Sequence, residues 1–319
     1  MRDAMESLVA DARDALGSDG PPHGGEPDTA PRFELFHAAN SICSHKVRAV
    51  LAHHGLPYAS HVLNMFEGQT YLPAYVRLRM VGCERFGGSL VSRHTGSTAA
   101  HAGCDGAVVP TLIDWRDGGV LVDSKRICIH LDNQGPEDLR LRPSPLVSRI
   151  DEQLAIVDDL PNYQLLMGRT PTTTEAARTA SDVGGAFSRR KVAWCDRYMA
   201  QNVAEPRLLA AYQAKRAKEL SAAENLFTPE AMREAYDRAE RSVVDLERSL
   251  GEVEGPFLYG AVVTMADLFW GIELLRMGNT GVSTFWEGGR LLRVEAFAAA
   301  TEGLPAIRSA VVEWPGAMF

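Results

Sequence analysis

From Phe33 to Gly55 the chain reads FELFHAANSICSHKVRAVLAHHG. Its first four residues alternate and are rich in aromatic side chains, which predicts a short strand. Further on, Val47, Val50 and Leu51 recur at the spacing of one helix face, and a glycine follows where that helix should end. The stretch therefore predicts a strand, a tight turn and a helix as the first unit of the fold.

A thiol and two hydroxyls lie where this helix should begin, in Ser41, Cys43 and Ser44. The free N–H groups and the dipole of a helix N-terminus favour an anion, and they can lower a cysteine pKa from about 8.5 to roughly 3.5–7.5. Cys43 is therefore predicted to be a nucleophile. An equally open interpretation is that Cys43 is a small buried hydrophobic side chain, because free cysteine is commonly buried.

The whole chain has 319 residues, of which 45% are hydrophobic, so it can bury a sizeable core divided between two domains. A net charge of -8 and the lack of a long apolar run predict no binding to nucleic acid and no membrane span. An odd number of cysteines predicts reduced thiols and a cytoplasmic protein. The 5 cysteines are Cys43, Cys83, Cys104, Cys128 and Cys195.

Residues 1–31 are expected to form a mostly flexible leader, because residues 17–31 are rich in Gly, Pro and Asp. Apolar residues between Met5 and Leu16 are nevertheless spaced as on one face of a short helix. No chemistry is expected in this part of the chain.

Residues 58–63 predict a second strand, and residues 73–80 predict a short helix or an irregular segment. Residues 81–107 have no hydrophobic periodicity and predict a long inserted loop near the mouth of the active site. Four potential zinc ligands fall in this loop, but their spacings match no close-set zinc pattern. We therefore expect no metal at Cys83, His94, His101 and Cys104.

Residues 108–122 predict a hairpin of two short strands joined by a glycine-containing turn. Pro110 lacks the N–H group that a sheet ladder requires, so it marks an edge or a special turn, for which a cis bond is one option. Asp123 and Ser124 precede the next helix. They fit an ordinary N-cap, and the same place also suits the binding of a polar ligand.

These motifs resemble the glutathione-binding domain of the glutathione S-transferase superfamily: SICS at 41–44, VVPTL at 108–112 and DS at 123–124. The resemblance implies an α/β, thioredoxin-like domain at residues 32–138, with glutathione as co-substrate and a homodimer as the assembly. It further implies that the Val109 backbone, next to a cis Pro110, pairs with the cysteinyl part of glutathione. Asp123 and Ser124 would then hold the γ-glutamyl end.

Residues 143–319 show helical periodicity in several long segments and predict an all-helical second domain. A pocket for a small aromatic substrate is expected there, although aromatic side chains at helical spacing are more often plain core. The candidates are Tyr163, Met167, Trp194 and Tyr198. Thr264 and Asp267, three residues apart before an apolar run, predict a capping box with a purely structural role.

Further segments resemble one branch of the superfamily, the reductive dehalogenases of chlorinated hydroquinones: PRFELFH at 31–37, YVRLR at 75–79 and ADLFW at 266–270. This resemblance implies that a glutathione thiolate expels chloride from the ring. Cys43 would then attack the glutathionyl sulfur and form a mixed disulfide, while Ser41 would hydrogen-bond a thiolate.

In the same helix, Lys46 and Arg48 are expected to be solvated, and His45 is expected at the surface rather than acting as a general base. Three alternative functions stay open. The first is glutathione-dependent cleavage of aryl ethers, as in β-etherases. The second is another glutathione transferase or isomerase activity without net reduction. The third is a ligand-binding protein without catalysis, against which the thiol of Cys43 argues.

Overall fold

The computed structural model describes residues 2–18, 20–24, 31–98, 103–117, 119–167 and 174–317. Its N-terminal half contains a mixed sheet with the strand order β1-β3-β2-β4-β5. The strands are β1 (Pro22–His23), β2 (Phe33–His37), β3 (Tyr58–Val62), β4 (Thr111–Asp114) and β5 (Gly119–Val122). β2 runs parallel to β3 and antiparallel to β4, and β4 forms the predicted hairpin with β5.

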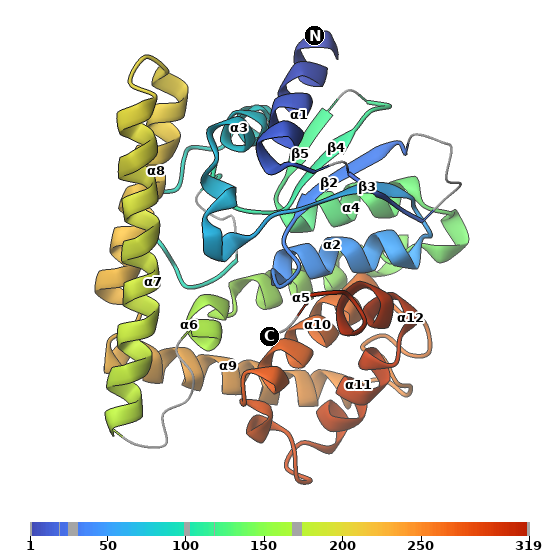
Figure 1. The fold of residues 1–319 in the computed structure, drawn as a ribbon. Coiled ribbons are helices and arrows are strands. Elements are labelled where there is room, and N and C mark those ends of the chain that lie inside the picture. Colours follow the sequence, from blue (N-terminus) through green and yellow to red (C-terminus); the bar gives the residue numbers. More distant parts are fainter. Residues whose placement is uncertain are drawn as a thin grey trace.

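Helices cover both faces of this sheet (Figure 1). They are α1 (Arg2–Leu16), α2 (Ile42–His53), α3 (Pro73–Phe86) and α4 (Ser124–Gln134). α2 and α4 pack together on one face, whereas α1 and α3 pack together on the other. The order strand, helix, strand, helix, hairpin, helix is that of a thioredoxin-like unit preceded by an additional helix.

The N-terminal segment is more ordered than its composition suggests. α1 buries Met5, Val9 and Ala12 in a core that α3 also supplies, so the predicted short helix is confirmed. The sequence did not predict β1, whose two residues pair with β3. Residues 19 and 25–30 of the predicted leader lie outside the described residues.

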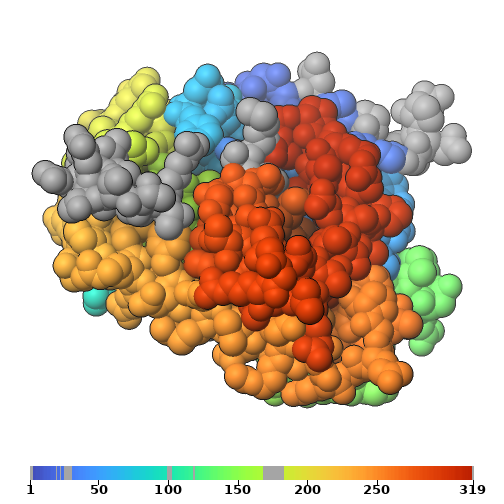
Figure 2. All heavy atoms as spheres, turned by 90° about the horizontal axis from the view of Figure 1, so that it is seen from below, coloured from blue at the N-terminus to red at the C-terminus, as the bar shows by residue number. Residues whose placement is uncertain are grey.

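The second half of the chain is helical, as predicted. Its longer helices are α5 (Val147–Asp159), α6 (Asn162–Met167), α7 (Thr174–Gln201), α8 (Pro206–Asn225), α9 (Pro229–Leu250), α10 (Met265–Asn279) and α11 (Leu292–Glu302), followed by the short α12 (Pro305–Ile307). α7 and α8 stand side by side as a long pair along one edge of the molecule (Figure 1). From below, the C-terminal elements cover much of the surface (Figure 2).

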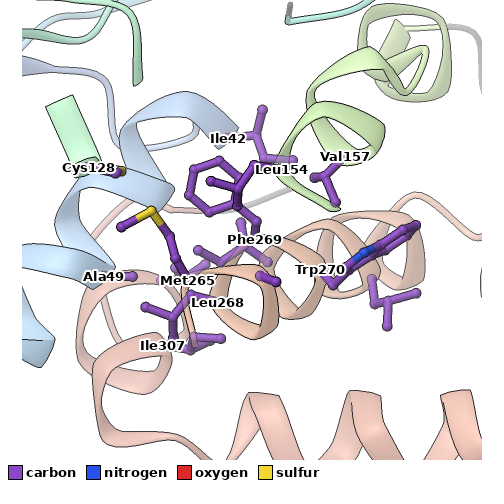
Figure 3. Packing of buried hydrophobic residues seen from close by; sticks show 14 of the residues in the cluster. Ile42, Ala49, Cys128, Leu154, Val157, Met265, Leu268, Phe269, Trp270 and Ile307 are labelled. Atoms are coloured by element: carbon purple, nitrogen blue, oxygen red, sulfur yellow. The ribbon is translucent and has the colours of Figure 1, made fainter. Parts of the chain in front are cut away.

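α10 is the buried helix that joins the two halves. Asp267 starts it with the predicted capping box, because its Oδ2 accepts hydrogen bonds at 2.7 Å from both the backbone N–H and the hydroxyl of Thr264. Met265 points toward α2 and Phe269 toward Ile42 and Leu154, whereas Leu268 lies beside Ile307 (Figure 3). One continuous core therefore connects the sheet unit with the helical unit.

α2 has buried polar side chains where solvated ones were expected. His45, Lys46 and Arg48 are all at most 1% exposed, so the prediction of a solvated face was wrong. The reason is that α4 packs on one side of α2 while α10, α12 and the segment Arg308–Val312 pack on the other. A helical period identifies an apolar face, but it does not reveal a second covering layer.

These buried charges have partners. Lys46 Nζ lies 2.7 Å from Asp158 Oδ1, and the ammonium group stacks on the ring of Phe269. Arg48 donates to the backbone carbonyls of Ala39 and Ala310 at 2.9 and 2.8 Å. Because a buried charge without partners is costly, these contacts explain how polar residues lie inside α2's packing interface.

Candidate active site

A cavity of about 310 Å³ lies where the start of α2, the start of α4 and the segment before β4 meet α6, α7 and α8. Eight of the ten residues predicted for the site line it: Ser41, Cys43, Val109, Pro110, Asp123, Ser124, Tyr163 and Met167. Concave sites of this size, with apolar walls and a few polar groups, are typical of small-molecule binding sites.

Cys43 lies in the first turn of α2 and is half-buried. Ser41 is the N-cap of this helix, because its Oγ accepts a hydrogen bond from the Ser44 N–H at 3.3 Å. Burial raises the pKa of the Cys43 thiol, although Lys46 and a hydrogen bond with Ser124 act in the opposite direction. The expected lowering of the Cys43 pKa was therefore wrong, because desolvation exceeds the modest effect of a helix N-terminus.

The segment before β4 passes Cys43 with a cis peptide bond between Val109 and Pro110. Arg79 holds this segment by donating hydrogen bonds to the Pro110 carbonyl and to the Thr111 hydroxyl. The Tyr75 hydroxyl donates to the carbonyl of Val108 at 2.7 Å. No role was predicted for these two supporting residues, although both lie in the YVRLR segment at 75–79.

Asp123 combines two features at the start of α4. Its backbone has a positive φ of 74°, which is uncommon for a residue with a side chain. Its Oδ1 accepts a hydrogen bond from the Arg126 N–H at 3.1 Å, so it caps α4. Burial also raises the pKa of this carboxyl. The N-cap interpretation is thus confirmed, and Asp123 also lines the cavity.

The predicted loop begins later than expected, because α3 continues to Phe86. Cys83 therefore lies in a helix, and it forms a disulfide with Cys104. The prediction of five reduced cysteines was wrong for this pair, since the sequence spacing did not reveal that the loop returns to α3. Val91, His94 and Thr98 of the loop line the cavity.

The four potential zinc ligands do not form a shared site among the described residues. Cys83 and Cys104 are bonded to each other, and His94 Nδ1 accepts a hydrogen bond from the Gly96 N–H at 2.9 Å. His101 lies outside the described residues.

Elsewhere, Asp114, Asp117 and His130 lie close enough to hold a metal ion. Arg32 already donates hydrogen bonds to both carboxylate oxygens of Asp114, each at 2.7 Å. The guanidinium group of Arg32 therefore takes the place that a metal ion would need.

Two of the four predicted substrate residues do not line the cavity. Trp194 packs on Tyr71, with a ring distance of 5.2 Å, and Tyr198 stacks on Tyr212 at 5.7 Å. Phe187, on the same helix, lines the cavity instead. Along one face of α7, Phe187 therefore lines the cavity, whereas Trp194 and Tyr198 pack against the core. The helical spacing of these residues does not predict this difference.

A cluster of charges beside the cavity was not predicted from the sequence. Lys215 Nζ lies 2.8 Å from Asp105 Oδ2 and 2.7 Å from Glu219 Oε1. Lys218 Nζ is 2.9 Å from the same Asp105 oxygen, and Lys191 Nζ is 3.2 Å from Glu219 Oε2. Although burial opposes it, the lysines lower the pKa of Glu219 to about 2, so this carboxyl is ionised. In the sequence, the cluster was indicated only by the helical spacing of Lys215, Lys218 and Glu219 along α8.

Comparisons with known proteins identify relatives of this chain. Residues 40–134 match the family "Glutathione S-transferase, N-terminal domain". Over 295 residues the chain is 36% identical to the 2,5-dichlorohydroquinone reductive dechlorinase of Sphingobium indicum, covering 91% of this chain and 85% of that protein.

Two solved structures have a similar fold. The β-etherase LigF from Sphingobium sp. strain SYK-6 gives a TM-score of 0.55 at 18% identity, covering 88% of this chain and 98% of that chain. Ure2p in complex with glutathione gives a TM-score of 0.55 at 16% identity, covering 89% of this chain and 95% of that chain. Among the described residues, no helix combines the length and the apolar character needed to cross a membrane.

Proposed function

Because this chain belongs to the glutathione S-transferase superfamily, we propose that it is a glutathione-dependent reductive dehalogenase of chlorinated hydroquinones. The observation that carries the proposal is the 36% identity, over most of both chains, to a reductive dechlorinase of 2,5-dichlorohydroquinone. A cavity with a thiol, hydroxyls and a carboxyl at one end and aromatic side chains at the other supports it.

In this proposal glutathione lies along the thioredoxin-like unit. The backbone of Val109 beside Pro110 pairs with the cysteinyl part of glutathione, and Asp123 and Ser124 bind the γ-glutamyl end. Asp123 is suited to an ammonium group because it carries a carboxyl group and lines the cavity. Ser41 hydrogen-bonds the glutathione thiolate, since its hydroxyl lies at the N-terminus of α2, where negative charge is favoured.

The reaction has three steps. The glutathione thiolate forms a bond to the chlorinated carbon of the quinonoid tautomer, and chloride leaves with the C–Cl electron pair. The thiolate of Cys43 then attacks the glutathionyl sulfur, and the ring carbon leaves with the C–S pair and takes a proton. A second glutathione thiolate releases Cys43 and departs as glutathione disulfide, so two thiols are oxidised for each carbon reduced.

The raised pKa of Cys43 suits this order of events. A thiol that stays protonated does not compete with glutathione for the chlorinated carbon in the first step. The same pKa shift makes deprotonation of Cys43 a requirement of the second step, because only the thiolate attacks sulfur. We further propose that the protein is a cytoplasmic homodimer, by analogy with the superfamily.

The test is product analysis of wild type and Cys43→Ser with 2,5-dichlorohydroquinone and glutathione. Wild type should release chloride and the monochlorinated hydroquinone. Cys43→Ser should release chloride but accumulate the aryl-glutathione conjugate, because a hydroxyl does not perform thiol–disulfide exchange. Mass spectrometry separates the two products, and Cys195→Ser, a buried cysteine outside the cavity lining, is the matched control.

Conjugate from both proteins, with no dehalogenated hydroquinone from wild type, would overturn the proposal. The chain would then be a plain transferase or an ether-cleaving enzyme, and an aryl ether substrate would separate those two. A wild type that binds glutathione but forms no product from either substrate would support a non-catalytic ligand-binding protein.

A further inference from the structure

The charge cluster beside the cavity has more ammonium groups than carboxylates. Lys191, Lys215 and Lys218 share Asp105 and Glu219, so one positive charge is not balanced within the cluster. Lys215 is almost completely enclosed, with 3% of its side chain exposed, whereas 14% of the Lys191 side chain is exposed. Lys218 is similarly accessible, at 16%, and both lysines line the cavity, but only Lys191 also lies against aromatic rings that line it.

Aromatic rings surround the ammonium group of Lys191. Its Nζ lies 4.5 Å from the ring centre of Tyr163 and 4.7 Å from that of Phe187, and it donates a hydrogen bond to the Tyr163 hydroxyl at 3.1 Å. The ring of His94 stacks on Tyr163 at 4.7 Å. Burial lowers the pKa of His94 well below its usual value, so this ring is neutral and does not add charge.

An aromatic wall continues from this point. Phe66 lies 5.6 Å from Phe187, measured between ring centres, and both side chains line the cavity. A planar ring can therefore rest on Phe66 and Phe187 with a substituent directed at Lys191. An ammonium group in this position would select a substituent that carries negative charge.

We propose that Lys191, held in place by the hydroxyl of Tyr163, which also hydrogen-bonds with Ser188, binds the ionised ring oxygen of the aromatic substrate, which is a phenolate. This inference rests on the proposed function, which names residues that bind glutathione but none that binds the aromatic substrate. An ammonium group has three N–H donors, and the bonds to Tyr163 and Glu219 use two of them, which leaves one for a ligand. Ring chlorines lower the pKa of a phenol, so halogenated hydroquinones readily supply this anion.

The same contact assists the first chemical step. Protonation of a ring carbon turns the bound phenolate into the quinonoid tautomer, in which the same oxygen is a carbonyl. When a thiolate then adds to a ring carbon conjugated with it, the displaced π electrons move to this carbonyl oxygen. A fixed positive charge beside that oxygen stabilises the negative charge as it develops. Lys191 thus binds the phenolate of the substrate and also favours addition of glutathione.

Binding of two ligands tests the site without requiring turnover. The ligands are 2,6-dichlorophenol, at a pH above its own pKa, and its methyl ether, which cannot ionise. In wild type the phenolate should bind at least about tenfold more tightly than the ether, as a hydrogen bond to a charged group predicts. Lys191→Met should lose this preference, and Lys191→Arg should keep most of it because the charge remains.

The matched control is Arg189→Met, which removes a cation from an exposed position of the same helix and should keep the wild-type preference. Glutathione binding by calorimetry shows whether each variant is folded. A wild-type preference in Lys191→Met, or no preference in wild type, overturns the site. If Lys191 controls the preference but wild type does not dechlorinate hydroquinones, the site stands and the proposed function fails. If wild type dechlorinates hydroquinones but Lys191→Met still prefers the phenolate, the proposed function stands and the site fails.

Discussion

The double role of Asp123 can be separated by two substitutions. Its carboxylate caps α4 through Arg126, the residue lines the cavity, and its backbone has a φ of 74°. Asp123→Asn keeps an oxygen for the cap and a residue type that tolerates positive φ, but it removes the charge. Asp123→Ala removes the charge and the cap together. Comparing the two variants therefore distinguishes a glutathione ligand from a helix cap.

The expected magnitudes follow from these contacts. Loss of a charge-assisted hydrogen bond to the glutathione ammonium group should weaken binding by at least about 1.5 kcal/mol, which is roughly tenfold in Kd. Both variants should show this loss. Only Asp123→Ala should also lose stability, by about 0.5–2 kcal/mol for the missing cap and by roughly 1–2 kcal/mol for an alanine at positive φ.

Calorimetric titration with glutathione and denaturant unfolding measure the two effects. Asp138→Asn, at an exposed position outside the cavity lining, controls for a general change of charge. If Asp123→Asn binds glutathione as tightly as wild type does, the carboxylate is only a cap, and the assignment of the γ-glutamyl end to this residue is refuted.

Two further predictions concern buried charges near Cys43. Lys46→Met should destabilise the fold by about 3–5 kcal/mol, because it leaves the carboxylate of Asp158 buried without its partner; a loss below about 1 kcal/mol in urea unfolding would contradict this. Burial raises the pKa of Glu273 from 4.5 to about 7, so the folded state binds its proton more tightly and stability falls as pH rises through this window. Glu273→Gln should therefore be more stable than wild type at a pH above 7 but not below 4.5, and an equal difference at both pH values in denaturant titrations would refute the assignment.

The sequence predicted the elements whose signals are local. The strand and helix around Cys43, the hairpin near Pro110 and the capping box at Asp267 each depend on residues close together in the chain. For the same reason, the six predicted site residues in the motifs at 41–44, 108–112 and 123–124 line one cavity. They lie at the ends of neighbouring elements of a recognisable fold, where a motif determines position.

Features that depend on distant packing were not predicted. Lys46 is buried because Asp158, far along the chain, supplies its counter-charge. Trp194 and Phe187 share one stripe of α7, and only the neighbouring elements decide which of them faces the cavity. The pKa of Cys43 likewise depends on the desolvation that surrounding elements impose, a quantity that helix position alone does not supply.

The enclosure of α2 between two layers has a consequence for divergence within the superfamily. A helix without a solvated side tolerates few substitutions, so changes near Cys43 disturb folding as well as chemistry. α7 and the segment at 87–98 contact the cavity from its other side, and many of their side chains face water. New substrate ranges should therefore arise by mutation of α7 and this segment, while the thiol chemistry is inherited unchanged.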